Sequence, residues 1–188
     1  LRKVPELIKT CVERADTAAV QAVLAFSFAS EQDQVTVAST PRLLEMLTHA
    51  AEKGATTQVK HMGIMALANL AAADDNKVRM FAKPGLVEVL MRAGDKGTSL
   101  IKHAGLLALS NLAHADDNKL PMFAKPGLVE VLMRAADKGE TSEVKEKGLG
   151  ALANLTSADD DKVPMFAKLG LVEVLMRAGD KGETSDIK

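Results

Sequence analysis

The amino-acid sequence predicts an all-α protein in which similar helical units stack side by side. Segments of about 42 residues recur along the chain. Apolar residues recur at helical spacing, with little of the alternation that is typical of strands. Glycine, proline and capping residues divide each period at the same places. A unit of this size cannot bury its apolar face alone, so neighbouring units must stack into a solenoid.

The repeat is visible when the chain is compared with itself. The stretch 83–93 returns unchanged as residues 125–135, and it returns as residues 168–178 with Leu169 in place of the proline. A more divergent copy begins at Thr40. A second block, Ala-Leu-Ala/Ser-Asn-Leu, ends each period. Its asparagines are 42 and then 43 residues apart, and they are Asn69, Asn111 and Asn154.

These periods predict one repeat array over residues 1–188. Complete units cover 31–73, 74–115 and 116–158, and partial units cover 1–30 and 159–188. We expect residues 1–30 to be the second and third helices of a unit without its first helix. Neither end carries a recognisable polar cap, which favours a longer natural array.

The first helix of the unit 74–115 is expected to begin at Asp74-Asp75-Asn76. Their side chains offer N-cap oxygens, and the aspartates place negative charge at the positive end of the helix. The helix should continue through Phe81 and end before Pro84-Gly85. We expect Gly85 and its copies to hold a sharp turn, because glycine adopts conformations that other residues avoid.

The second helix is expected over residues 86–93, with Pro84 suited to its first turn and the segment 94–97 closing it. Thr98 or Ser99 then caps a longer third helix. Apolar and small residues follow the spacing of one buried face in that helix, and glycine and alanine among them permit close helix contact. These residues are Ile101, Gly105, Ala108 and Leu112.

Composition excludes several classes of function. With 24 basic and 25 acidic residues, the chain has a net charge of −1 and no overall field to attract nucleic acid. No apolar run approaches the ~20 residues that span a bilayer, so we expect no membrane insertion. Cys11 is the single cysteine, which excludes an internal disulfide and favours a reducing compartment, the cytoplasm or the nucleus.

Catalytic and cofactor-binding groups are few. None of the candidate side chains recurs in every unit, so we expect a protein that is not an enzyme and holds no cofactor or metal. The turn 94–99 faintly resembles a phosphate loop, but it lacks the GxxxxGK[ST] spacing and follows a helix. It is interpreted as a C-cap glycine followed by a capping residue. The candidates considered are His49, His61, His103, His114 and Cys11.

The unit resembles the armadillo repeat. Asp-Asn-Lys, then Pro-Gly-Leu-Val-x-Val-Leu, a glycine-rich turn and Ala-Leu-Ser-Asn-Leu-Ala follow the first, second and third helices of that family in order. The resemblance covers nearly the whole chain and implies a right-handed α-α superhelix of about four three-helix repeats. HEAT repeats, which have two helices per unit, are the nearest alternative.

A row of asparagines is the best candidate for a binding site. Asn111 lies off the buried stripe of its helix, as do Leu107 and His103 one and two turns earlier. An exposed amide donates and accepts, so one asparagine per unit can pair with the backbone of an extended peptide. We name the equivalent residues the third-helix column: His61, Met65, Asn69, His103, Leu107, Asn111, Glu146 and Asn154.

The resemblance implies that this column lines the inside of the superhelix, where armadillo proteins bind extended partner segments. The chain departs from the members that carry nuclear-import cargo, which place Trp four residues before the asparagine. Here those positions are Met65, Leu107 and Gly150, and Phe26 replaces the first asparagine. We therefore expect a scaffold that binds a protein segment of mixed polarity.

Three alternatives remain open. The asparagine amides can instead bond to the neighbouring backbone and stabilise the stack. The chain can be a structural subunit of a larger assembly, or a regulatory armadillo domain that senses a metabolite. The sequence does not decide the oligomeric state.

Overall fold

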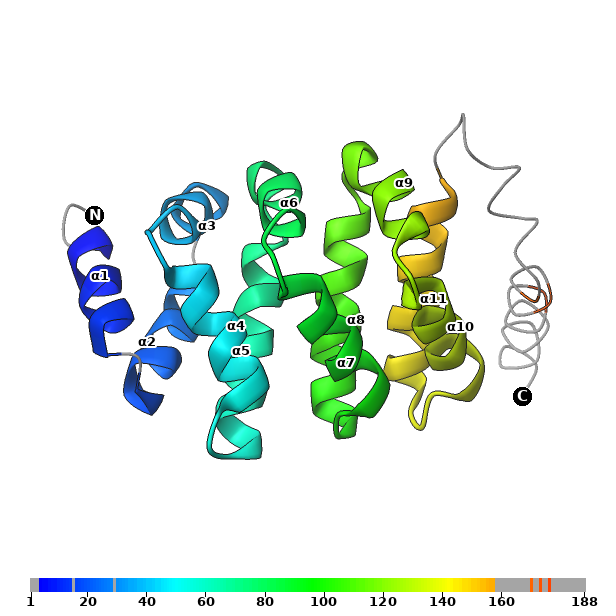
Figure 1. Ribbon diagram of the computed structural model, residues 1–188, viewed down its shortest axis with the longest axis horizontal. Helices are drawn as coiled ribbons and strands as arrows, with labels where there is room; N and C mark the ends of the chain where they lie inside the picture. Colours follow the sequence, from blue (N-terminus) through cyan, green and yellow to red (C-terminus); the bar gives the residue numbers. More distant parts are fainter. Residues whose placement is uncertain are drawn as a thin grey trace, which may run out of the picture.

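The computed structural model describes residues 4–14, 16–28 and 30–157, together with residues 170, 173 and 176. These residues form eleven helices and no strand, so the all-α prediction is confirmed. The helices follow one another along the long axis of the molecule (Figure 1). Their bounds are α1 Val4–Arg14, α2 Thr17–Ser27, α3 Glu31–Ala38, α4 Leu43–Lys53, α5 Thr57–Leu70, α6 Asp74–Phe81, α7 Leu86–Lys96, α8 Ser99–Ala113, α9 Asp116–Ala124, α10 Leu128–Lys138 and α11 Ser142–Thr156.

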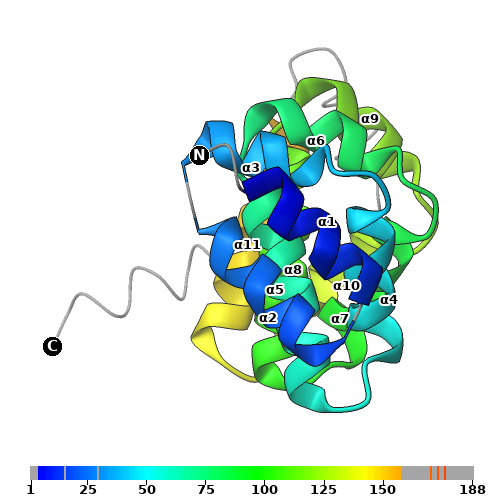
Figure 2. The ribbon, with the colours of Figure 1, turned by 90° about the vertical axis from the view of Figure 1, so that its left-hand side faces the viewer.

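Three columns of helices are visible when the molecule is viewed along this axis (Figure 2). The short helices α3, α6 and α9 lie together, α4, α7 and α10 form a second column, and α2, α5, α8 and α11 form a third. Each of the ranges 31–73, 74–115 and 116–158 thus holds a first, a second and a third helix. The helices α1 and α2 occupy the second and third places of a preceding unit, since α2 packs on α5 as α5 packs on α8. The partial unit expected at 159–188 lies outside the described residues, except for residues 170, 173 and 176.

One continuous apolar core runs through the stack, from Val20 to Leu155. The stripe predicted for the third helix of the unit 74–115 is buried, because Ile101, Gly105, Ala108 and Leu112 all face this core. Gly105 also brings α8 close to α7: an added Cβ would lie 2.9 Å from the Ala93 Cβ and 2.9 Å from the Gly94 nitrogen. Glycine is therefore needed here for close packing.

The turn between the first and second helices recurs with the same backbone conformation. Gly85, Gly127 and Gly170 have φ values of 79°, 81° and 90°, in the left-handed region. Arg42 takes the equivalent place in the unit 31–73 with φ of 63°. No heavy atom outside the neighbouring residues lies within 4 Å of a Cβ added to Gly85, so a side chain there is disfavoured by the backbone and not by crowding.

The second helix is longer than the predicted range 86–93. The helix α7 continues through Gly94 to Lys96, and Gly97 is its C-cap residue. Gly94 is buried, and a Cβ added to it would lie 3.1 Å from the Leu106 side chain of α8. Pro84 precedes the N-cap residue of this helix, so it does not lie in the first turn as expected. The predicted start of the third helix is confirmed, with Thr98 as the N-cap residue of α8, but the Thr98 side chain makes no cap hydrogen bond.

None of the three predicted capping residues caps α6, because the helix already begins at Asp74 and its N-cap residue is Ala73, with no side-chain cap hydrogen bond. Asn76 lies within the helix. It is fully buried, and its Nδ2 donates to the backbone carbonyl of Leu70 at 2.8 Å and to that of Gln34 at 3.3 Å. Asn118 likewise donates to the carbonyl of Leu112 at 2.9 Å. Each of these asparagines satisfies a carbonyl at the end of a third helix, where no intrahelical donor remains.

Ion pairs connect successive units on the side of the second helices. Lys83 lies 2.9 Å from Glu45, and Lys125 lies 2.6 Å from Glu88, one unit further on. These hydrogen bonds from lysine lower the pKa of both carboxyl groups. A parallel row joins Arg92 to Glu52 and Arg134 to Asp95. We name these four pairs the ion-pair ladder.

We predict opposite effects of alanine at two glycines. Gly85→Ala should lower the free energy of unfolding by about 1 kcal/mol, because alanine is strained at positive φ. Gly150→Ala should raise it by about 0.5 to 1 kcal/mol, since Gly150 lies inside α11 and the nearest atom to its added Cβ, Ser110 Oγ, is 3.6 Å away. Urea unfolding measures both values. A Gly85→Ala variant as stable as the wild type would contradict the turn assignment, and a destabilised Gly150→Ala variant would contradict the open space at that position.

We also predict that the ladder contributes to acid sensitivity. A carboxyl group whose folded pKa is lowered stabilises the fold above its unfolded pKa, about 4.3 for glutamate, and this contribution is lost as the pH falls through the lowered value. The double variant Glu45→Gln, Glu88→Gln should therefore lose less stability than the wild type between pH 5 and pH 2. Asp75→Asn, an exposed position outside the ladder, is the control in acid unfolding monitored by circular dichroism. Parallel acid curves for wild type and double variant would contradict the prediction.

Candidate functional site

The third-helix column lies on the adjacent helices α5, α8 and α11 (Figure 1). Seven of its eight residues are half-buried, and Glu146 is exposed. The members are four residues apart on α5 and α8 and eight apart on α11, so on each helix they share one face. Gly150 stands between Glu146 and Asn154 and leaves open space in the column, because its added Cβ would approach only Ser110 Oγ, at 3.6 Å.

The three asparagines each donate a hydrogen bond to the preceding unit. Asn111 Nδ2 donates to the carbonyl of Ala68 at 2.9 Å. Asn154 Nδ2 lies 3.1 Å from both the carbonyl and the hydroxyl of Ser110. Asn69 Nδ2 donates to the Ser27 hydroxyl at 3.0 Å. The amide nitrogens therefore connect successive third helices, as the stack-stabilising alternative expects.

The acceptor of the Asn111 bond is a carbonyl at the end of α5. The backbone N–H of Ala72 donates to Asn69 and not to Ala68, because the last turn of α5 tightens. Ala68 is fully buried, so solvent does not reach it, and Asn111 supplies its donor. The asparagine is thus held in place by a bond that the adjacent unit requires.

Charges along the column are mixed. The ammonium group of Lys147, 2.8 Å from Glu146, lowers the pKa of that carboxyl, and the charge of His103 adds to the effect. His61 and His103 occupy equivalent places one unit apart. This arrangement offers no strongly basic or acidic surface to a ligand.

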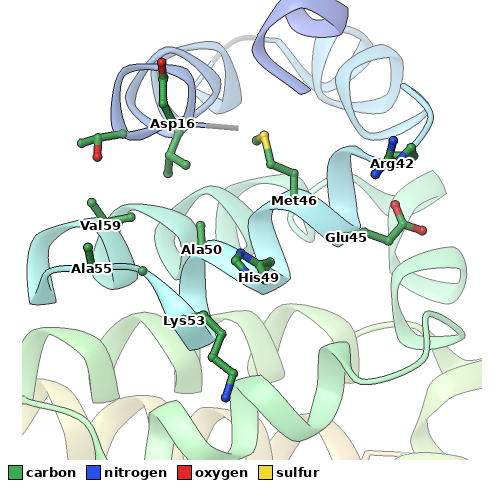
Figure 3. Close-up of a pocket in the computed structure, with 12 residues that line it drawn as sticks. Asp16, Arg42, Glu45, Met46, His49, Ala50, Lys53, Ala55 and Val59 are labelled. Atoms are coloured by element: carbon green, nitrogen blue, oxygen red, sulfur yellow. The ribbon is translucent and has the colours of Figure 1, made fainter. Parts of the chain in front are cut away.

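Within the part of the chain that the structure describes, three cavities stand out at junctions between units. One of about 510 Å³ lies between α2 and α4 and is lined by Asp16, Met46 and His49 among others (Figure 3). A second, of about 450 Å³, lies between α4 and α7. A third, of about 420 Å³, lies where α4 and α5 meet α7 and α8. No residue of the third-helix column lines any of these three.

The groups considered for catalysis do not converge. His49 lines the first cavity, His61 and His103 belong to the column, and His114 is the exposed C-cap residue of α8. Burial raises the pKa of the Cys11 thiol, an effect that Arg14 partly offsets. Among the described residues, no group of three or more His, Cys, Asp or Glu side chains could hold a metal ion. None of the described helices is long and apolar enough to cross a membrane.

The sequence analysis missed the basic residues around the third cavity. Lys53, Lys60 and Lys96 all line it. One signal was present, because Lys60 recurs as Lys102 and Lys145 at the spacing of the units. Regular recurrence does not distinguish a lysine on an open surface from a lysine beside a cavity, and only the stacking of two units shows the difference.

Comparison with known proteins shows a similar fold. No family model and no curated protein matches the sequence. Among solved structures, the chain is similar to an engineered protein whose crystal structure was determined by the Northeast Structural Genomics Consortium. The TM-score is 0.79 at 24% sequence identity, and the match covers 94% of this chain and 72% of that one. The likeness shows the all-α fold.

We predict that Asn111→Ala lowers the free energy of unfolding by about 1 to 3 kcal/mol, because it leaves the buried carbonyl of Ala68 without its donor. His103→Ala, half-buried two turns earlier on the same helix, is the matched control and should cost less. Urea unfolding of both variants measures the difference. Equal losses of stability would show that the hydrogen bond from the Asn111 amide contributes no more than side-chain packing does.

Proposed function

We propose that the protein is a non-enzymatic, armadillo-type scaffold that binds an extended segment of a partner protein along the third-helix column. In this proposal the three-helix units belong to a right-handed superhelix, and the protein acts in the cytoplasm or the nucleus without binding nucleic acid. The observation that carries the proposal is the recurrence of a half-exposed asparagine on each of three adjacent third helices.

The hydrogen bonds between units leave polar groups of the asparagine side chains available for a ligand. In Asn69 and Asn111 the bond uses one N–H of Nδ2, so the second N–H and the acceptor Oδ1 remain for a ligand. In Asn154, whose Nδ2 contacts both the carbonyl and the hydroxyl of Ser110, Oδ1 remains as an acceptor. A side chain that is already held by the neighbouring unit loses little conformational freedom when a ligand binds. The same residues can therefore stabilise the stack and present ordered polar groups to a peptide backbone.

Spacing and polarity describe the expected partner. Adjacent packed helices lie ~10 Å apart, so the outer asparagines are ~20 Å apart. Because an extended chain rises ~3.3 Å per residue, a segment of roughly seven to nine residues spans them. Met65 and Leu107 offer apolar contacts between the polar groups, and Gly150 offers room for a side chain of the partner.

The structural-subunit hypothesis is supported by a different observation. Val78 and Leu120 occupy equivalent places on the first helices α6 and α9, and they are 44% and 48% exposed. Such a row could pack against a neighbouring molecule on the face formed by the first helices. The two hypotheses predict contact on different faces, so matched substitutions distinguish them.

The test uses random nonapeptides displayed on phage, selected against the purified protein. Met65→Lys with Leu107→Lys should weaken the binding of selected peptides by about tenfold or more, since apolar contacts are lost. Long side chains at half-buried positions can extend to solvent, so the fold should persist, as circular dichroism would verify. Val78→Lys with Leu120→Lys is the matched control and should retain binding. Loss of binding in the control and retention in the column variant would overturn the proposal in favour of the first-helix face.

A further inference from the structure

A carboxylate of the chain itself occupies an anion-binding position between the last two complete units. Glu140 lies in the loop between α10 and α11, and it contacts α8 of the preceding unit. Lys102 Nζ donates to its Oε1 at 2.6 Å, and the Ser99 hydroxyl donates to its Oε2 at 3.1 Å. These two bonds lower the pKa of Glu140. A lysine and a hydroxyl at the start of a third helix therefore form a site for an anionic group.

The same pair of side chains occurs one unit earlier. Thr57 and Lys60 of α5 are equivalent to Ser99 and Lys102 of α8. The facing loop differs, because it lacks one residue: Gly97 is followed directly by Thr98, whereas Glu140 is inserted at this point in the next copy. Thr57, Lys60, Gly97 and Thr98 instead line the cavity of about 420 Å³, which we name the junction cavity.

Positive charge is concentrated around the junction cavity. Lys53, Lys60 and Lys96 line it, together with Arg92. Its one acidic lining residue, Glu52, is paired with Arg92. The helices α5 and α8 begin beside the cavity and the helices α4 and α7 end there, so their dipoles offset one another and the positive charge comes from the lysines. An apolar floor is formed by Ile64, Val89 and Ile101.

The first cavity of the chain provides a contrast. It takes the equivalent place one unit earlier, but Asp16 and Glu45 line it together with Arg42 and His49. Lys53, which lines both cavities, points away from Met46 and toward the helices of the next unit (Figure 3). Of these two cavities, only the junction cavity therefore has several basic residues without a similar number of acidic ones.

We propose that the junction cavity binds a small, multiply charged anion that bears carboxylate or phosphate groups. One anionic group takes the position against Lys60 and Thr57 that Glu140 takes against Lys102 and Ser99. Lys53 and Lys96 bind further anionic groups, and the apolar floor accommodates the carbon skeleton of the ligand. This inference does not depend on peptide binding, since no residue of the third-helix column lines the cavity.

The experiment measures binding of citrate and of inorganic phosphate by isothermal titration calorimetry at low salt, where charge contacts are least screened. Lys60→Met should weaken the binding of both by about tenfold, because it removes a charge-assisted hydrogen bond. Lys9→Met removes the same charge from an exposed position on α1 and should leave binding unchanged. Equal weakening in both variants would reveal only a general effect of net charge and would overturn the proposal.

Two further variants use the repeat itself as a control. Insertion of a glutamate between Gly97 and Thr98 recreates the loop of the next unit, so it should abolish citrate binding and raise the melting temperature. Deletion of Glu140 recreates the loop of the preceding unit, so it should add a second site at Lys102 and Ser99, which would appear as an increase in binding stoichiometry. Undiminished citrate binding in the insertion variant would contradict the assigned position.

A hexaglutamate peptide distinguishes the source of the anionic groups. Tighter binding of the peptide than of citrate, lost in Lys60→Met and in the insertion variant, would assign the cavity to acidic side chains of a protein ligand. Tighter binding of citrate would assign it to a free small molecule. Absence of saturable binding for citrate, phosphate and peptide alike would refute the proposal.

Discussion

The contact between successive third helices is the interaction on which the rest of the structure depends. A unit of three helices has too little interior to bury its apolar residues, so each third helix packs against the one before it and the one after it. The core is consequently continuous from Val20 to Leu155. At the same interface, backbone carbonyls of one unit accept hydrogen bonds from the asparagines of the next unit. Each repeat therefore depends on a side chain of its neighbour to complete its backbone hydrogen bonding.

This dependence gives the asparagine row two roles that are difficult to separate by substitution. The amide nitrogen completes the backbone hydrogen bonding of the preceding helix, and the remaining amide groups are ordered as a result. A residue that recurs for structural reasons is then available for recognition at every unit. Recurrence of the asparagine alone does not show which role is used, whereas Met65 and Leu107, which make no such bond to the preceding unit, isolate the recognition role.

Because the units are nearly identical, the structural effect of a single-residue difference between two of them can be identified. One inserted residue, Glu140, converts a lysine and hydroxyl pair from the lining of a cavity into an internally paired site. Arg42 similarly replaces glycine at a turn that is otherwise glycine in each described copy, and it adopts the same left-handed conformation. Each repeat therefore acts as a reference for its neighbours, because the surrounding architecture is nearly constant while a single position changes.

Local features of the chain were determined by the sequence itself. Helical periodicity located the buried face of α8, and glycine marked the positive-φ turns, because both depend on residues within one or two helical turns. The stacked tertiary structure alone decided which distant groups meet. Asn76 donates to the carbonyl of Gln34, Asn111 donates to the carbonyl of Ala68, and Lys102 donates to Glu140. Such pairs depend on the rotation and separation of whole units, and no local pattern specifies how one helix face is set against another about 40 residues away in the chain.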